Sequence, residues 1–93
     1  MYLDPLDAVW LSDSVLAVTK TSLSDTNMVH TYVFDPDAPS LTEIDAEATG
    51  IFNTSLERHP SLPIVYANDS SGFTVRWFEY DDAGNLTPIS SVN

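Results

Sequence analysis

Short runs of β-branched and aromatic residues recur along the chain, and each run is closed by Asp, Pro, Asn, Ser or Gly. Such runs are typical of strands, whereas the periodicity of an amphipathic helix is almost absent. The pattern predicts eight strands, at Ala8–Ser12, Val15–Thr21, Met28–Phe34, Leu41–Ala46, Phe52–Glu57, Ile64–Asn68, Thr74–Tyr80 and Leu86–Ser91. We therefore expect an all-β fold with two antiparallel sheets of four strands each.

Two of the connections carry residues that favour hairpin turns. The segments Phe34–Ser40 (FDPDAPS) and Tyr80–Asn85 (YDDAGN) place Asp where its carboxylate can accept hydrogen bonds from backbone amides. Gly84 in the second segment and the prolines in the first are suited to a tight turn. The segment His59–Pro63 (HPSLP) is predicted to be a loop, because its two prolines cannot donate to a strand ladder.

The chain contains an internal repeat, which is the strongest feature of the sequence. Thr31–Ile44 matches Arg76–Ile89 at a constant offset of 45 residues, with Tyr32 aligned to Trp77. The match includes a strand, its turn and the Leu-Thr pair that opens the next strand. Both segments are therefore expected to form the same supersecondary unit.

A second match lies upstream, where VLAVTK from Val15 aligns with IVYAND from Ile64 at an offset of 49 residues. The extra residues of the second unit fall in the His59–Pro63 loop, and insertions in loops are what a structural repeat predicts. We therefore predict a single all-β unit over residues 1–93, made of two repeats at about 7–50 and 51–93.

A repeat of about 45 residues with four short strands fits a blade of a β-propeller, in which each sheet stacks on its neighbours. Two blades alone leave two sheet faces uncovered. The chain is then expected to belong to a longer propeller or to be completed by other copies of itself. The structural alternative is a small β-sandwich of two four-stranded sheets.

The second unit resembles a known family of propellers. Arg58–Ser90 resembles a blade of the seven-bladed lactonase-type propellers, the family of 6-phosphogluconolactonase and the fungal carboxymuconate-cyclising enzymes. The motif residues occur in the family's order: His59, Pro60, Tyr66, Asn68, Asp81, Gly84, Leu86 and Thr87. The first unit is less similar, since Ser14 stands where the His-Pro pair would fall and Pro39 stands where the glycine would be.

The resemblance implies a propeller fold and a sugar-lactone or muconolactone substrate for a complete enzyme of that family. It assigns no catalytic residue, because no position of this chain can be matched to the family's catalytic Arg, His or Glu.

Charge narrows the range of partners. Fourteen acidic residues against three basic ones give a net charge of -11, which repels phosphate backbones and anionic lipids. Nucleic acid and membrane are therefore not expected partners. An acidic surface of this kind suits a protein kept soluble in concentrated salt, a face for a basic partner or cation, or a solvated surface without a specific role.

The chain has no cysteine, which removes disulfides, thiolate metal sites and cysteine nucleophiles and leaves the redox compartment undetermined. No apolar run reaches the ~18 residues of a membrane span. We expect a soluble protein and favour the cytoplasm as its compartment.

Histidine is the first candidate for catalysis, since a general base needs a partner carboxylate. His59 has Glu57 nearby, and His30 lies in a predicted strand. A structural turn is the favoured interpretation of His59, and nothing in the sequence favours catalysis by His30.

Acidic turns are the candidates for a metal. Asp35, Asp37, Asp81 and Asp82 could supply oxygen ligands, but a calcium cage needs ~6–8 oxygens and neither turn matches the calcium-loop motif. Capping of the turns is the favoured interpretation. No catalytic, cofactor-binding or metal-binding residue is assigned, and no cofactor is expected.

Aromatic residues could line a ligand groove or fill the space between sheets, and the second interpretation is favoured. They are Trp10, Tyr66, Phe73, Trp77 and Phe78. Arg58 and Arg76 are the two guanidinium groups that could hold an anionic substrate.

These observations favour a non-catalytic structural or protein-interaction module. Its expected partners are further copies of the chain, further propeller blades or another protein. The alternative is a segment of a lactone hydrolase or cycloisomerase, and fold class alone does not decide between the two.

Overall fold

The computed structural model describes residues 5–20, 28–48, 53–69 and 75–92, and these form eight strands. The strands are β1 (Pro5–Trp10), β2 (Val15–Lys20), β3 (Met28–Asp35), β4 (Ser40–Ala48), β5 (Asn53–Arg58), β6 (Ile64–Asp69), β7 (Val75–Tyr80) and β8 (Leu86–Val92). They form two antiparallel sheets, here called sheet A (β1–β4) and sheet B (β5–β8), in which sequential strands are neighbours. The predicted all-β fold with four strands in each of two sheets is confirmed.

The sequence pattern placed most strand ends within two residues of those observed. Three predicted ends, Thr21, Phe52 and Thr74, lie outside the described residues. The largest difference is at the start of the first strand, because β1 begins at Pro5 and not at Ala8. It ends at Trp10, and the next residues form a turn. In that turn Leu11 N donates to Val15 O (2.8 Å), and Ser12 Oγ accepts from Val15 N (3.2 Å).

The two sheets repeat one hydrogen-bonding plan. In each sheet, one backbone hydrogen bond closes the turn between the first two strands. A second bond runs from the end of the third strand to the residue just before the second strand. The matching bonds are Leu11 N to Val15 O (2.8 Å) with His59 N to Ile64 O (2.8 Å), and Phe34 N to Ser14 O (2.8 Å) with Tyr80 N to Pro63 O (2.9 Å).

The register of the third strand differs from the sequence alignment by one residue. Leu16 pairs with Tyr32 in sheet A, whereas its counterpart Val65 pairs with Phe78 in sheet B. Phe78 therefore occupies the position equivalent to Tyr32, and Trp77 does not. The gap-free alignment missed this shift because the β7–β8 turn is one residue shorter than the β3–β4 turn. Tyr80 pairs with Leu86, whereas the equivalent Phe34 pairs with Leu41.

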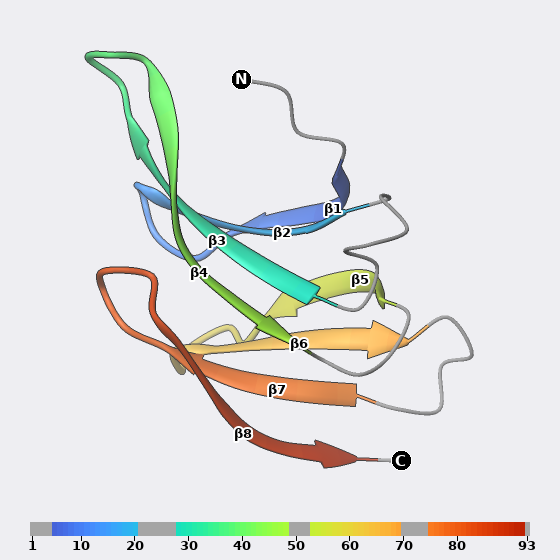
Figure 1. Cartoon of the computed structure of the whole chain (residues 1–93). Coiled ribbons are helices and arrows are strands. Elements are labelled where there is room, and N and C mark those ends of the chain that lie inside the picture. The colour runs from blue at the N-terminus through green and yellow to red at the C-terminus, as the bar shows by residue number, and fades with distance from the viewer. Residues whose placement is uncertain (1–4, 21–27, 49–52, 70–74, 93) are drawn as a thin grey trace.

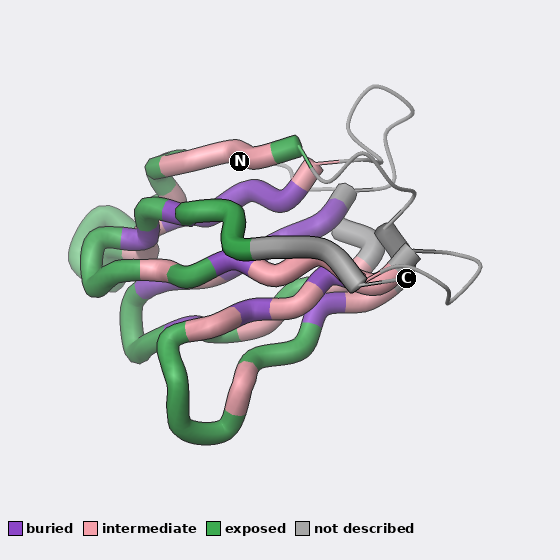
Figure 2. The backbone as a smooth tube through the Cα atoms, turned by 90° about the horizontal axis from the view of Figure 1, so that it is seen from below, coloured by how far each residue is buried: buried purple, intermediate pink, exposed green. Residues whose placement is uncertain are grey.

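The sheets lie one over the other, with β5 against β1 and β2, and β8 beside β4 (Figure 1). The core lies between them and takes residues from both sheets: Leu11, Val15, Ala17, Val29, Leu56, Val65, Ala67, Phe78 and Leu86. Buried positions follow the strands, and exposed positions gather at the connecting loops (Figure 2). Alternation along each strand explains why one face is apolar, since successive side chains point to opposite faces.

The two sheets present non-equivalent faces to each other. In β2 the core residues are Val15 and Ala17, and their counterparts in β6, at the offset of 49, are Ile64 and Tyr66 on the opposite face of sheet B. The core residues of β6 are the alternate ones, such as Val65. The units therefore stack head to tail, so that each sheet turns the same face in the same direction.

Candidate functional site

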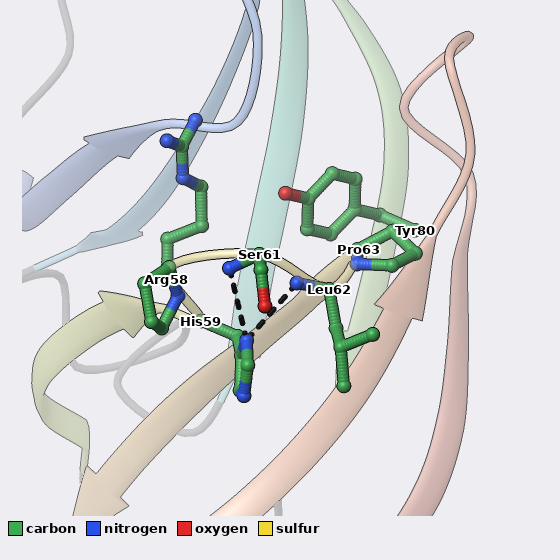
Figure 3. Close-up of a pocket in the computed structure, with 7 residues that line it drawn as sticks. Arg58, His59, Ser61, Leu62, Pro63 and Tyr80 are labelled. Carbon is green, nitrogen blue, oxygen red and sulfur yellow. Dashed lines mark hydrogen bonds between the residues drawn. The ribbon is translucent and has the colours of Figure 1, made fainter.

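A hollow of about 280 Å³ lies at the loop between β5 and β6. It is lined by Arg58, His59, Pro60, Ser61, Leu62, Pro63 and Tyr80. Arg58 and His59 extend to opposite sides of this loop (Figure 3), so their polar groups do not converge on one ligand. The predicted loop over His59–Pro63 is confirmed, because β6 begins at Ile64.

His59 uses its ring to hold the loop. Its Nδ1 accepts hydrogen bonds from Ser61 N (3.1 Å) and Leu62 N (3.0 Å). An accepting Nδ1 places the proton of the neutral ring on Nε2. Glu57, the carboxylate expected near it, pairs with Tyr66 in the ladder, and no described hydrogen bond joins it to His59. The geometry fits the structural interpretation of His59.

The arginines are held by the fold. Arg58 Nη1 donates to the carbonyl oxygens of Trp10 (3.4 Å) and Leu11 (3.3 Å), which links sheet B to sheet A. Arg76 pairs with Ala67 in the ladder, which places it on the face toward sheet A, and its Nε is buried without a hydrogen-bond partner in the described structure. The two guanidinium groups therefore do not form a joint anion site.

His30 forms a pair with Glu43 that the sequence analysis did not detect. His30 Nδ1 lies 2.6 Å from Glu43 Oε1, and the ring of His30 stacks on Tyr32 at a centroid distance of 6.4 Å. His30 is buried, whereas Glu43 is exposed over about half of its side chain (49%). A bulge between Thr31 and Tyr32 shifts the register of β4 and brings the carboxylate diagonally across to the imidazole. No pattern along either strand signals such a bulge.

The acidic turns cap their own backbones, as the sequence predicted. Asp35 Oδ1 accepts from Asp37 N (2.9 Å), and Asp81 Oδ1 accepts from Ala83 N (3.0 Å) and Asn85 N (2.9 Å). The side chain of Asn85 and then its backbone amide hold the pKa of Asp81 below its ordinary value. Within the described ranges, no three His, Asp or Glu side chains gather as metal ligands would.

Two aspartates of sheet A join the sheets, and sequence reasoning missed both. Asp7 Oδ2 accepts from Leu56 N (2.7 Å), and Asp45 Oδ2 accepts from Leu86 N (2.8 Å). Burial, and then the charge of Asp45 and a hydrogen bond with it, raise the pKa of the neighbouring Glu47. An acidic residue at an inward-facing position of a strand is the sequence signal that could have identified Asp7 and Asp45.

The outer face of sheet B lies on the side away from sheet A, and no other described sheet covers it. By strand register it contains Ser55, Glu57, Ile64, Tyr66, Asn68, Val75, Trp77, Glu79 and Thr87. None of these residues is buried. Tyr66 and Trp77 form an edge-to-face aromatic pair at its centre, with ring centroids 5.5 Å apart and planes at 84°.

The outer face of sheet A, at the other end of the stack, differs in its burial. Its central residues Val18 (0% exposed), Tyr32 (4%) and His30 (6%) are buried within the single chain. The two ends of the stack are therefore unequal among the described residues. The centre of the sheet B end is partly exposed, although the Trp77 Nε1 atom itself is buried.

The predicted aromatic core is confirmed in one position. Phe78 is buried in the core, whereas Tyr66 and Trp77 are half-buried on the outer face of sheet B. Trp10 is 48% exposed and contacts the Phe34 ring from sheet A. The remaining aromatic candidate, Phe73, lies outside the described residues.

Among the residues that the structure describes, no helix could cross a bilayer. Comparison of the sequence with protein-family models and with curated proteins gives no match.

Proposed function

We propose that this chain is a non-catalytic protein-interaction module of the β-propeller type, which binds through the outer face of sheet B. The observation that carries the proposal is the unequal burial of the two ends of the stack. Sheet B covers a face of sheet A, and no other sheet among the described residues covers the equivalent face of sheet B, centred on Tyr66 and Trp77.

The head-to-tail stacking supports the propeller-type arrangement over a two-fold sandwich. In a two-fold sandwich, equivalent residues of the two sheets would meet at the interface. Here Ala17 lies in the core, but its counterpart Tyr66 lies on the far side of sheet B. A stack of this kind accepts a further sheet from a longer chain, from another copy or from another protein.

Association through this face should become visible when charge repulsion is removed. In molar salt the charges of an acidic protein are screened, and we expect light scattering to show two chains joined where low salt shows one. Trp77→Ser should abolish the change in mass, and Trp10→Ser, which alters the exposed indole of sheet A, should not. A monomer at every salt concentration would contradict an association surface on sheet B.

The alternative function is lactone hydrolysis or cycloisomerisation, as the family resemblance implies. In such enzymes the site would lie in a central channel formed by several blades. Arg58 is engaged by backbone carbonyls and His59 Nδ1 by backbone amides. We therefore expect the purified chain to leave gluconolactone hydrolysis at the rate in buffer, and a saturable acceleration would favour the enzyme.

A further inference from the structure

We infer that the outer face of sheet B recognises a basic protein segment, with an arginine side chain seated on the Tyr66–Trp77 pair between the carboxylates of Glu57 and Glu79. The inference rests on the proposed function, because it takes the same face as the interaction surface and names the chemistry of its partner.

Strand register places both carboxylates beside the aromatic pair. Glu57, Tyr66 and Trp77 are direct cross-strand partners in one row of the ladder. Glu79 follows Trp77 by two residues on the same strand and pairs with Ile64 in the next row. Direct cross-strand neighbours have Cβ atoms ~4.5–5.5 Å apart, so an arginine over the rings is within reach of both carboxylates.

The nine strand residues listed for this face include no Lys or Arg. The nearest imidazole is His59, whose ring centroid lies 6.4 Å from that of Tyr66 and whose Nδ1 accepts from two loop amides. Glu57 and Glu79 are exposed. The arginines of sheet B, Arg58 and Arg76, alternate with these residues and pair with Val65 and Ala67 on the opposite face. A guanidinium group would supply the missing charge, and its planar form stacks on aromatic rings.

A second copy fits the face less well than a basic partner. Two-fold pairing of this face would bring the patch with Glu57 and Glu79 of one chain against the same acidic patch of the other, which is unfavourable without salt.

Head-to-tail pairing would also lack the contacts that join sheet A to sheet B. The position equivalent to Asp7 is occupied by Ser55, which removes one carboxylate acceptor. The positions equivalent to Ala17 and Thr31 carry the larger Tyr66 and Trp77, so a copy could not approach as closely.

The probe for this inference is a tetra-arginine peptide, with the neutral isostere tetra-citrulline as its control. Trp10→Phe leaves Trp77 as the single indole of the chain, so its fluorescence reports binding at the face. In low salt we expect saturable quenching by the arginine peptide and no response to the citrulline peptide.

Matched variants separate this face from the general acidity of the chain. Glu57→Gln with Glu79→Gln should weaken binding by about tenfold, since it removes both carboxylates beside the rings. Asp13→Asn with Asp82→Asn changes the net charge equally at two exposed turn positions and should weaken it by less than about twofold.

Equal quenching by the citrulline peptide, or equal weakening by the two double variants, would overturn the inference. So would a dimer in the low-salt buffer, because a second copy would then cover the face. The proposed function fails by a different result, since it requires the Trp77-dependent increase in mass in molar salt whether or not arginine binds.

Discussion

Gly84 lies at a close approach between the two sheets. Its φ of +93° lies in the left-handed region, which side chains rarely adopt. Thr31 Oγ1 donates to its carbonyl oxygen at 2.6 Å in a buried setting, and an added Cβ would lie 3.2 Å from Val15 Cγ1. Glycine is therefore required here both by the turn and by the contact with sheet A.

Gly84→Ala should lower the free energy of unfolding by about 1–3 kcal/mol, because it adds backbone strain and a close contact. Urea denaturation followed by tryptophan fluorescence measures the change. Ala83→Ser, at an exposed position of the same turn, should alter stability by less than about 0.5 kcal/mol. Equal stability of Gly84→Ala and the parent chain would show that neither constraint is needed.

Asp45 is a second single residue on which stability depends, because its carboxylate accepts hydrogen bonds from two backbone amides. Its Oδ1 accepts from Ala46 N (2.8 Å) and its Oδ2 from Leu86 N (2.8 Å). Asp45→Ala leaves the Leu86 amide without its partner and should cost about 1–3 kcal/mol of unfolding free energy. Asp45→Asn should cost less, since its amide oxygen can still accept. Chemical denaturation of both variants tests this order, and the reverse order would contradict the assigned bond.

The β7–β8 hairpin shows how an element depends on one exposed carboxylate. Hydrogen bonds from Asn85 and from the turn amides stabilise charged Asp81 and lower its pKa below the ordinary value of 3.8. A group with a lowered folded pKa stabilises the fold fully above its unfolded pKa, and the contribution is lost as pH falls through the folded value.

Asp81→Asn should therefore reduce stability near neutral pH and cease to matter in strong acid. Thermal unfolding from about pH 6 to about pH 2 would show the two curves converging as the parent carboxylate is protonated. Asp82→Asn, at the exposed neighbouring position, is the control and should follow the parent. A constant gap between parent and Asp81→Asn at all pH values would be the opposite result.

Local sequence carried most of the information about the elements. Alternation placed the strands, and Asp81 with Gly84 identified the turn, because these features depend on neighbours in the chain. Two features could not be read in this way. The bulge at Thr31/Tyr32 depends on the fit between strands, and the His30–Glu43 pair follows from that bulge.

The candidate site was less predictable than the fold. Tyr66 and Trp77 were expected to be core residues or groove residues, and they lie on the outer face of sheet B. Alternation shows which residues share a face, but it does not show which face a second sheet will cover. The offset of 45 also aligned Trp77 with Tyr32, whereas the structural counterpart of Tyr32 is Phe78.

At the scale of the whole molecule, the two sheets share one hydrophobic core. The buried cluster draws on both repeats, with Val15 and Ala17 of sheet A against Val65 and Phe78 of sheet B. Short chains bury a smaller fraction of their surface than long ones, and a sheet must bury its apolar face against a second layer.

Chains of residues 1–50 and 51–93, prepared separately, should therefore lack a cooperative thermal transition. Circular dichroism of each half and of their mixture is the measurement, with the intact chain as reference. A cooperative transition in either half alone would mean that one repeat folds without the other.

The unequal burial of the two ends of the stack also affects how many partners one chain can bind. A sheet pair with two equivalent open ends could be extended in both directions, as a link in a filament. In this chain the central residues are buried at one end, where Val18 and Tyr32 lie, and partly exposed at the other, where Tyr66 and Trp77 lie. If the proposed function holds, the described residues offer one docking position, and we expect the chain to terminate an assembly with one partner per chain.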